Sequence, residues 1–89
     1  MSSITLAFSS NATLPLAGLR TGVGGVVVEV RASDAGRADR LLALGVTPGA
    51  RVTVLQTFPG IVFLCDQTEL AVERGVAESI IVHCEELRS

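Results

Sequence analysis

The 89-residue chain contains no tryptophan or tyrosine, and its three phenylalanines are not interleaved with basic residues. Proteins that bind single-stranded nucleic acid stack bases on aromatic side chains next to Lys or Arg, so the sequence argues against this class. Charge is also scarce, because 18% of the residues are charged and the formal net charge is -2. The seven basic residues are scattered and form no stripe that could follow the phosphate backbone of a nucleic acid, so we predict no nucleic-acid partner.

Long apolar runs are missing too, although 48% of the residues are hydrophobic. No run approaches the roughly 20 residues that span a bilayer, and residues 1–8 lack the cationic start of a secretory signal. Two cysteines are too few to staple a secreted mini-protein, which fits a reducing compartment. We therefore predict a cytoplasmic protein that does not insert into the membrane and has one small core.

The centre of the chain predicts a helix near Asp34 to Leu44. Ser33 or Asp34 can cap its first turn by accepting a backbone hydrogen bond, and Gly45 can adopt the left-handed conformation that ends a helix. One helical face, with the spacing i, i+3, i+4, i+7, consists of Ala38, Leu41, Leu42 and Gly45. We expect this face to pack on the core, with Leu41 and Leu44 as core residues.

Short alternating segments on either side of this helix predict β-strands. The glycine-dense residues 21–25 predict a tight loop before a strand at 26–30, and residues 47–49 predict a turn into a strand near 51–55. We expect a turn at 58–60, strands at 61–65, 69–72 and 80–84, and a short helical turn at 74–79. About five short strands joined by tight turns favour a small closed barrel, because closure removes exposed sheet edges.

The start of the chain is rich in serine and carries few large side chains. We therefore expect a flexible N-terminal arm at residues 1–13 and a single barrel domain at residues 14–89. Ile4, Leu6 and Phe8 alternate with smaller residues, so the arm could instead add an edge strand.

Residues 40–54 read R-L-L-x-L-G-x-x-P-G-x-x-V-x-V, and Leu16, Leu19, Gly22 and Gly25 precede them. The segments 68–72 and 77–82 follow. This order of motifs resembles the FeoA family of small proteins attached to bacterial ferrous iron uptake. The family's common Pro-Leu-Gly-Asp-Pro loop is replaced here by Phe58-Pro59-Gly60, which weakens any inference drawn from that loop.

The resemblance implies a mainly β protein, a small SH3-like β-barrel of about five strands with one α-helix and a short helical turn. It also implies a non-enzymatic cytosolic partner of FeoB, the membrane transporter of ferrous iron that carries a GTPase domain. The same fold occurs as the C-terminal domain of iron-dependent repressors of the DtxR type. A metal-responsive regulatory domain that binds a transition metal is therefore the alternative.

The cysteines and the only histidine offer little for catalysis or metal binding. His83 and Cys84 are neighbours on a predicted strand and should point to opposite faces, so a catalytic dyad is geometrically poor and we expect no enzyme. Cys65, His83 and Cys84 suit zinc or ferrous iron as ligand types, but no C-x-x-C or H-x-x-x-H pair is present. We expect no cofactor, with weak Fe²⁺ or Zn²⁺ binding as the alternative, and an inert buried Cys65.

Residues 61–64, Ile-Val-Phe-Leu, form an apolar run on a predicted strand. One face of a barrel strand points outward, so part of this run should be covered by something else. The cover is either the N-terminal arm or another protein, and a second copy in a homodimer is one version of the latter. Partner contacts are expected through Val62 and Leu64 or through Ile61 and Phe63, and the phase of Cys65 favours Val62 and Leu64.

Overall fold

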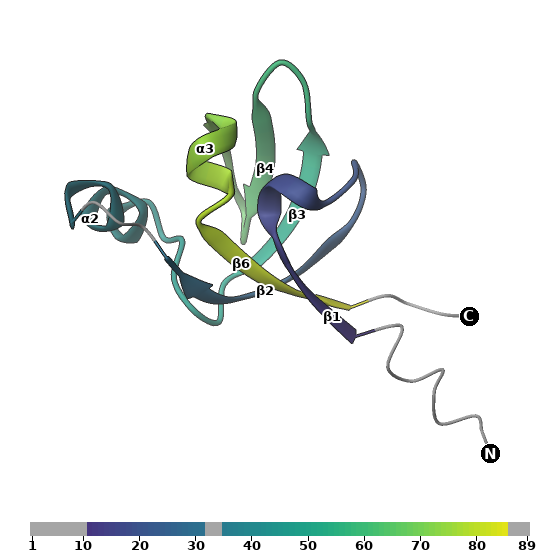
Figure 1. Ribbon diagram of the computed structural model, residues 1–89, viewed down its shortest axis with the longest axis horizontal. Helices are drawn as coiled ribbons and strands as arrows, with labels where there is room; N and C mark the ends of the chain where they lie inside the picture. The colour runs from purple at the N-terminus through teal and green to yellow at the C-terminus, as the bar shows by residue number, and fades with distance from the viewer. Residues whose placement is uncertain (1–10, 32–34, 86–89) are drawn as a thin grey trace.

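The structure is a computed structural model that describes residues 11–31 and 35–85. Its elements are β1 (Asn11–Pro15), the short 3-10 helix η1 (Leu16–Gly18), β2 (Gly24–Val30), α2 (Ala35–Ala43), β3 (Arg51–Gln56), β4 (Ile61–Cys65), β5 (Thr68–Val72), α3 (Arg74–Ala77) and β6 (Ile80–Glu85). The strands form one antiparallel sheet in the order β1-β6-β2-β3-β4-β5, which curls around the core (Figure 1). The predicted mainly β fold with one helix and a short helical turn is confirmed.

β1 is a strand that the sequence pattern does not predict. It pairs with β6 along its whole length, from Asn11 opposite Glu85 to Pro15 opposite Ile81. The segment is short, contains polar residues and ends in a proline, as edge strands often do, and such a segment gives little periodic signal. The alternating residues Ile4, Leu6 and Phe8 lie outside the described part of the chain.

The core is filled by the inward residues of nearly every strand. Alternation is confirmed on β4, where Ile61, Phe63 and Cys65 are buried and the residues between them are half-exposed. It is confirmed on β3 through Val52 and Val54. The largest fully buried side chains are Phe63, Leu16, Ile61, Ile80, Val27, Val46, Val52, Val54 and Val82. The core therefore depends on branched aliphatic side chains around one phenylalanine.

The glycines before the second strand have a different role from the one predicted. The turn is confined to Thr21 and Gly22, whose φ is +90°, whereas Gly24 and Gly25 already belong to β2. A Cβ atom at Gly25 would lie 2.9 Å from the Cα atom of Cys84 on β6. The prediction of a loop over residues 21–25 is thus wrong in its second half, because two of its glycines serve close packing of strands.

On the other side of β2, the contact with β3 is equally close. A Cβ atom at Gly24 would lie 2.5 Å from the carbonyl oxygen of Val52 and 2.9 Å from the hydroxyl of Thr53. Real Cβ atoms do not approach backbone oxygens so closely, so a side chain here would push the two strands apart.

The helix α2 ends as the sequence predicts. Gly45 has φ of +93°, and the N–H of Val46 donates to the carbonyl of Leu41 at 2.9 Å, which satisfies a carbonyl of the last turn. The proposed caps, Ser33 and Asp34, lie outside the described residues.

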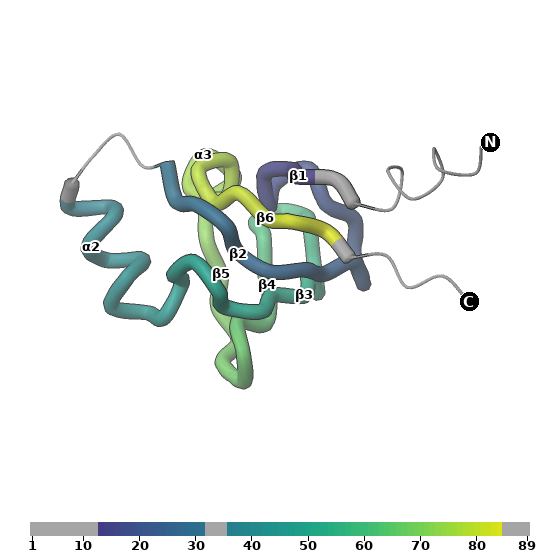
Figure 2. The backbone as a smooth tube through the Cα atoms, turned by 90° about the horizontal axis from the view of Figure 1, so that it is seen from below, coloured from purple at the N-terminus to yellow at the C-terminus, as the bar shows by residue number. Residues whose placement is uncertain are grey.

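The predicted core face of this helix is only partly right. Leu41 is 3% exposed, but Leu42 is 61% and Leu44 46% exposed. The reason is the position of the helix, which lies at one end of the molecule beyond the curled sheet (Figures 1 and 2). A helix in that position offers a narrow stripe to the core, so the predicted core roles of Leu42 and Leu44 are wrong.

Arg74 of α3 joins two connecting segments of the barrel through hydrogen bonds to their backbone. Its guanidinium donates one hydrogen bond of 2.7 Å to the carbonyl of Thr57, in the connection between β3 and β4, and another of 3.5 Å to the carbonyl of Ala17 in η1. Three segments that are distant in sequence are thereby joined by one side chain. The connection that contains Phe58 is therefore fixed at its base.

We expect Leu41→Ala to lower the free energy of unfolding by about 2 to 5 kcal/mol, because it removes buried methyl groups and leaves a cavity. Leu42→Ala and Leu44→Ala are matched controls near the same end of α2. Each should change the free energy of unfolding by less than about 1 kcal/mol, since both side chains are exposed. Urea denaturation of the three variants measures the difference. Equal losses in all three would contradict this description of the helix.

Candidate partner-binding site

The outward side of β3, β4 and β5 carries a group of apolar side chains. Val62 and Leu64 alternate with the buried residues of β4 and are half-exposed. Ala71, opposite Val62 on β5, is exposed, and Leu55 on β3 is 42% exposed. We call these four residues the outer apolar patch.

A bulge shapes this patch. The register of β3 against β4 shifts between Val54 and Gln56, so Val54 pairs with Phe63 whereas Gln56 pairs with Val62. Leu55 is the extra residue of this bulge and lies beside Val62. A β-bulge changes the direction in which a side chain points. Leu55 is not among the residues predicted from the sequence, although its position next to the buried Val54 in an alternating strand is a signal for an outward side chain.

Polar groups border the patch. Glu69 lies opposite Leu64, and Asp66 in the β4–β5 turn is held by the backbone of Arg51. The N–H of Asp66 donates to the Arg51 carbonyl at 2.8 Å, and the N–H of Arg51 donates to the Asp66 carboxylate at 3.3 Å. An apolar centre inside a polar border is the usual composition of a protein–protein contact.

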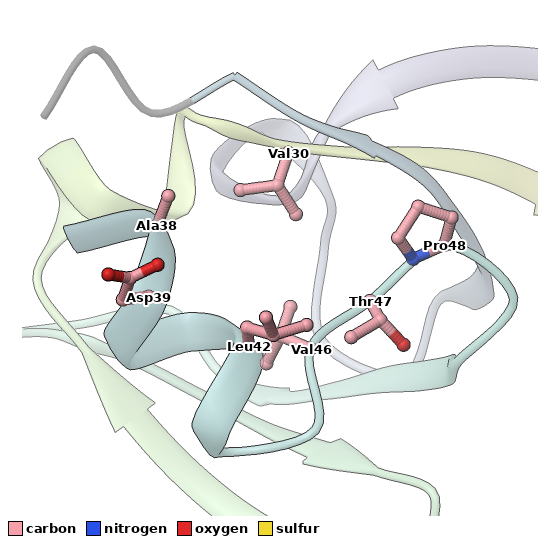
Figure 3. Close-up of a pocket in the computed structure, with 7 residues that line it drawn as sticks. All are labelled: Val30, Ala38, Asp39, Leu42, Val46, Thr47 and Pro48. Atoms are coloured by element: carbon pink, nitrogen blue, oxygen red, sulfur yellow. The ribbon is translucent and has the colours of Figure 1, made fainter. Parts of the chain in front are cut away.

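A second feature is an apolar hollow next to α2, which Figure 3 shows from close by. Its volume is about 200 Å³, and it is lined by Val30, Ala38, Asp39, Leu42, Val46, Thr47 and Pro48. Cofactor and drug-sized ligands occupy roughly 300 to 1,000 Å³. The hollow therefore has the size for a side chain rather than a cofactor. The periodicity of the helix did not reveal it, because it depends on the turn after the helix.

A third feature is Phe58, in the connection between β3 and β4. Its side chain is 80% exposed, more than any other large apolar side chain in the part of the chain that the structure describes. The sequence predicts only a turn at this residue. Exposed aromatic side chains are frequent anchors of protein contacts.

Cys65 is buried, as predicted. Its thiol donates to the carbonyl of Gly45 at 3.6 Å and so ties β4 to the end of α2. Burial raises the pKa of the thiol above its usual 9.0, and the negative charge of Asp66 raises it further. The thiol is therefore protonated at neutral pH, a form that is neither nucleophilic nor ready to bind a metal.

His83 and Cys84 lie on opposite sides of β6, as predicted. Cys84 is buried, and His83 is half-exposed. Cys65 and Cys84 share one row across the sheet, but Val52 on β3 and Gly25 on β2 stand between them. In the described ranges no three His, Cys, Asp or Glu side chains lie close enough to hold a metal ion. The candidate ligands named from the sequence are not brought together.

Residues 14–84 match the model of the FeoA domain family. The structure is similar to the crystal structure of an iron uptake regulatory protein (FeoA), with a TM-score of 0.74 and 27% identity over 82% of this chain and 99% of that one. It is also similar to the FeoA protein from Chlorobium tepidum, with a TM-score of 0.72 and 35% identity over 80% and 70% of the two chains.

The fold extends beyond these proteins. A manganese-dependent transcriptional repressor matches with a TM-score of 0.77 and 21% identity, over 83% of this chain and 42% of the repressor, which shows a likeness of fold alone. Sequence comparison with curated proteins gives no match. The shared fold is the SH3-like barrel. No helix within residues 11–31 and 35–85 is long and apolar enough to cross a membrane.

We expect alkylation of Cys65 by iodoacetamide at pH 8 to be at least about tenfold slower in the native protein than in urea, because the thiol is buried and protonated. Mass spectrometry of the labelled peptides measures this rate separately from that of Cys84. Equal rates in the two conditions would contradict the burial of the thiol.

The same thiol gives stability a defined pH dependence. Since its folded-state pKa lies above the unfolded value near 9.0, the folded state keeps a proton that the unfolded state releases at high pH. The contribution of the protonated Cys65 thiol to the free energy of unfolding is complete below pH 9.0 and is lost as the pH rises above this value. Cys65→Ala should reduce the slope of unfolding free energy against pH in this range, and an unchanged slope would contradict the assignment.

Proposed function

Because the chain belongs to the FeoA domain family, we propose that it is a small non-enzymatic accessory protein of ferrous iron uptake that docks onto the cytosolic part of the transporter FeoB. Docking is by protein–protein contact and modulates transport without iron being carried on this chain. The observation that supports this most is the outer apolar patch of Leu55, Val62, Leu64 and Ala71.

The patch has the composition that a reversible contact needs. Its centre, Val62 with Leu64, lies on a strand in the middle of a three-stranded meander, where the backbone is paired on both sides. Rigid apolar side chains lose little conformational entropy on binding, so burial of their surface is retained as affinity. Ile61 and Phe63, the alternative pair on this strand, are fully buried in the core. They are therefore not available for contact with a partner.

The side chains that could do chemistry support a binding role as well. The proton of the Cys65 thiol is engaged by the Gly45 carbonyl, and its raised pKa opposes the thiolate that metal coordination requires. His83 points away from Cys84, so the two do not form a nucleophile and base pair. We therefore favour docking over a metal-responsive domain, whose resemblance to this chain is one of fold.

Replacing Val62 and Leu64 together by Ser should weaken binding to the cytosolic region of FeoB at least about tenfold, since two central apolar anchors are lost. Isothermal titration calorimetry measures the Kd, and circular dichroism checks that the variant is folded. A matched control replaces Val23 and Val28 together by Ser. These two residues are also exposed but lie outside the patch, so this variant should keep the wild-type Kd.

Three outcomes would count against parts of this proposal. An unchanged Kd in the Val62 and Leu64 variant would refute the patch as the contact. Loss of binding in Leu42→Ser, with the patch variant intact, would move the contact to the helical end of the molecule. A wild-type protein that does not bind FeoB would refute the proposed function itself.

A further inference from the structure

Two features outside the outer apolar patch are complementary to each other. One is the protruding side chain of Phe58, and the other is the hollow beside α2. We propose that this chain associates with a second copy of itself head to tail, with Phe58 of one copy inserted into the hollow of the next. This contact is independent of the docking onto FeoB and uses different residues.

The connection that carries Phe58 is anchored at its base. The carbonyl of Thr57, the residue before Phe58, accepts a 2.7 Å hydrogen bond from Arg74, and the same guanidinium reaches the carbonyl of Ala17. The base of the connection is therefore held on the barrel, and a phenyl ring has few rotatable bonds. An aromatic side chain presented in this way loses little entropy when it is buried.

The hollow has the size and lining for this ring. An apolar cavity of about 150 Å³ is sufficient to bind benzene, and the hollow offers about 200 Å³. The side chains of Val30, Leu42 and Val46 gather around it, with Pro48 on the far side (Figure 3). Leu42 is largely exposed in the single chain, so an inserted ring would remove apolar surface from water on both copies.

Charge supports the same pairing. Asp39 lies at the border of the hollow and, within the described residues, makes no salt bridge, whereas Arg37 and Arg40 of the same helix do not line the hollow. Arg74, next to Phe58, is exposed and donates to two neutral backbone carbonyls, so its positive charge is not neutralised by them. When Phe58 enters the hollow, Arg74 of one copy approaches Asp39 of the other. Such opposite charges at a border fix the orientation of a contact.

The β3–β4 connection forms the top of the molecule in Figure 1, whereas α2 lies at the left end. The proposed contact is heterologous: each copy gives Phe58 to one neighbour and receives the Phe58 of another in its hollow, which yields a ring or an open chain. A homodimer through β4, by contrast, would be symmetric and would not need Phe58.

Sedimentation velocity of the full chain over a range of concentrations tests the proposal. The weight-average sedimentation coefficient of the wild type should rise with concentration. Phe58→Ala removes the ring and Ala38→Trp fills the hollow, so each variant should sediment as a monomer. The decisive sample is a mixture of these two variants. It should form a 1:1 dimer that grows no further, because one variant keeps the hollow and the other keeps Phe58.

Val23→Ala and Ala43→Trp are matched controls, because one truncates an exposed apolar side chain elsewhere and the other places Trp on α2 outside the hollow. Both should associate as the wild type does. If Ala38→Trp is not folded by circular dichroism, Leu42→Lys replaces it, since that side chain is already exposed. A wild-type protein that is monomeric up to about 1 mM, association that survives in both variants, or a mixture without dimer would overturn the proposal.

Discussion

The close passage of β2 between β3 and β6 is the constraint on which the rest of this structure depends. Neither neighbour leaves room for a side chain at Gly24 or Gly25. The absence of a Cβ atom lets the backbone of β6 approach, and the sheet can curl at this point. Because β6 then lies over the core, Ile80 and Val82 are fully buried. The surfaces proposed for binding exist because this curled sheet fixes which residues point outward.

Much of the fold was predictable from local patterns. The alternation of Val52 with Val54, the phase of Cys65 and the stop at Gly45 each depend on physics within a few residues, and each is confirmed. Interpretation of the glycines failed at Gly24 and Gly25, because a glycine demanded by a close neighbour looks the same in sequence as a glycine demanded by a turn.

The helix shows a second limit of sequence reasoning. Periodicity identifies an apolar stripe, but it does not say how far the surface beneath the stripe extends. At the end of the barrel that surface covers Leu41 and not Leu42. The same reasoning explains why Phe58 and the hollow were missed, since their relation depends on positions in space that no local pattern contains. The outward phase of Val62 and Leu64 was found because strand alternation is local.

The function proposed for this chain depends on surfaces rather than on reactive groups. Its two thiols face the core from different strands, and one of them stabilises the junction between β4 and the end of α2. The outer apolar patch is centred on β4, which is paired with β3 and with β5, whereas Phe58 belongs to the β3–β4 connection and the hollow lies beside α2. This separation would allow contact with a transporter and contact between copies to occur on the same chain.

The most direct measurement of the central claim is a titration of the ¹⁵N-labelled protein with the cytosolic region of FeoB, followed by amide chemical shifts. The account predicts that the largest changes fall on Leu55, Val62, Leu64 and Ala71 and that amides of α2 change little. No change at saturating FeoB, or changes confined to α2 and its hollow, would contradict it.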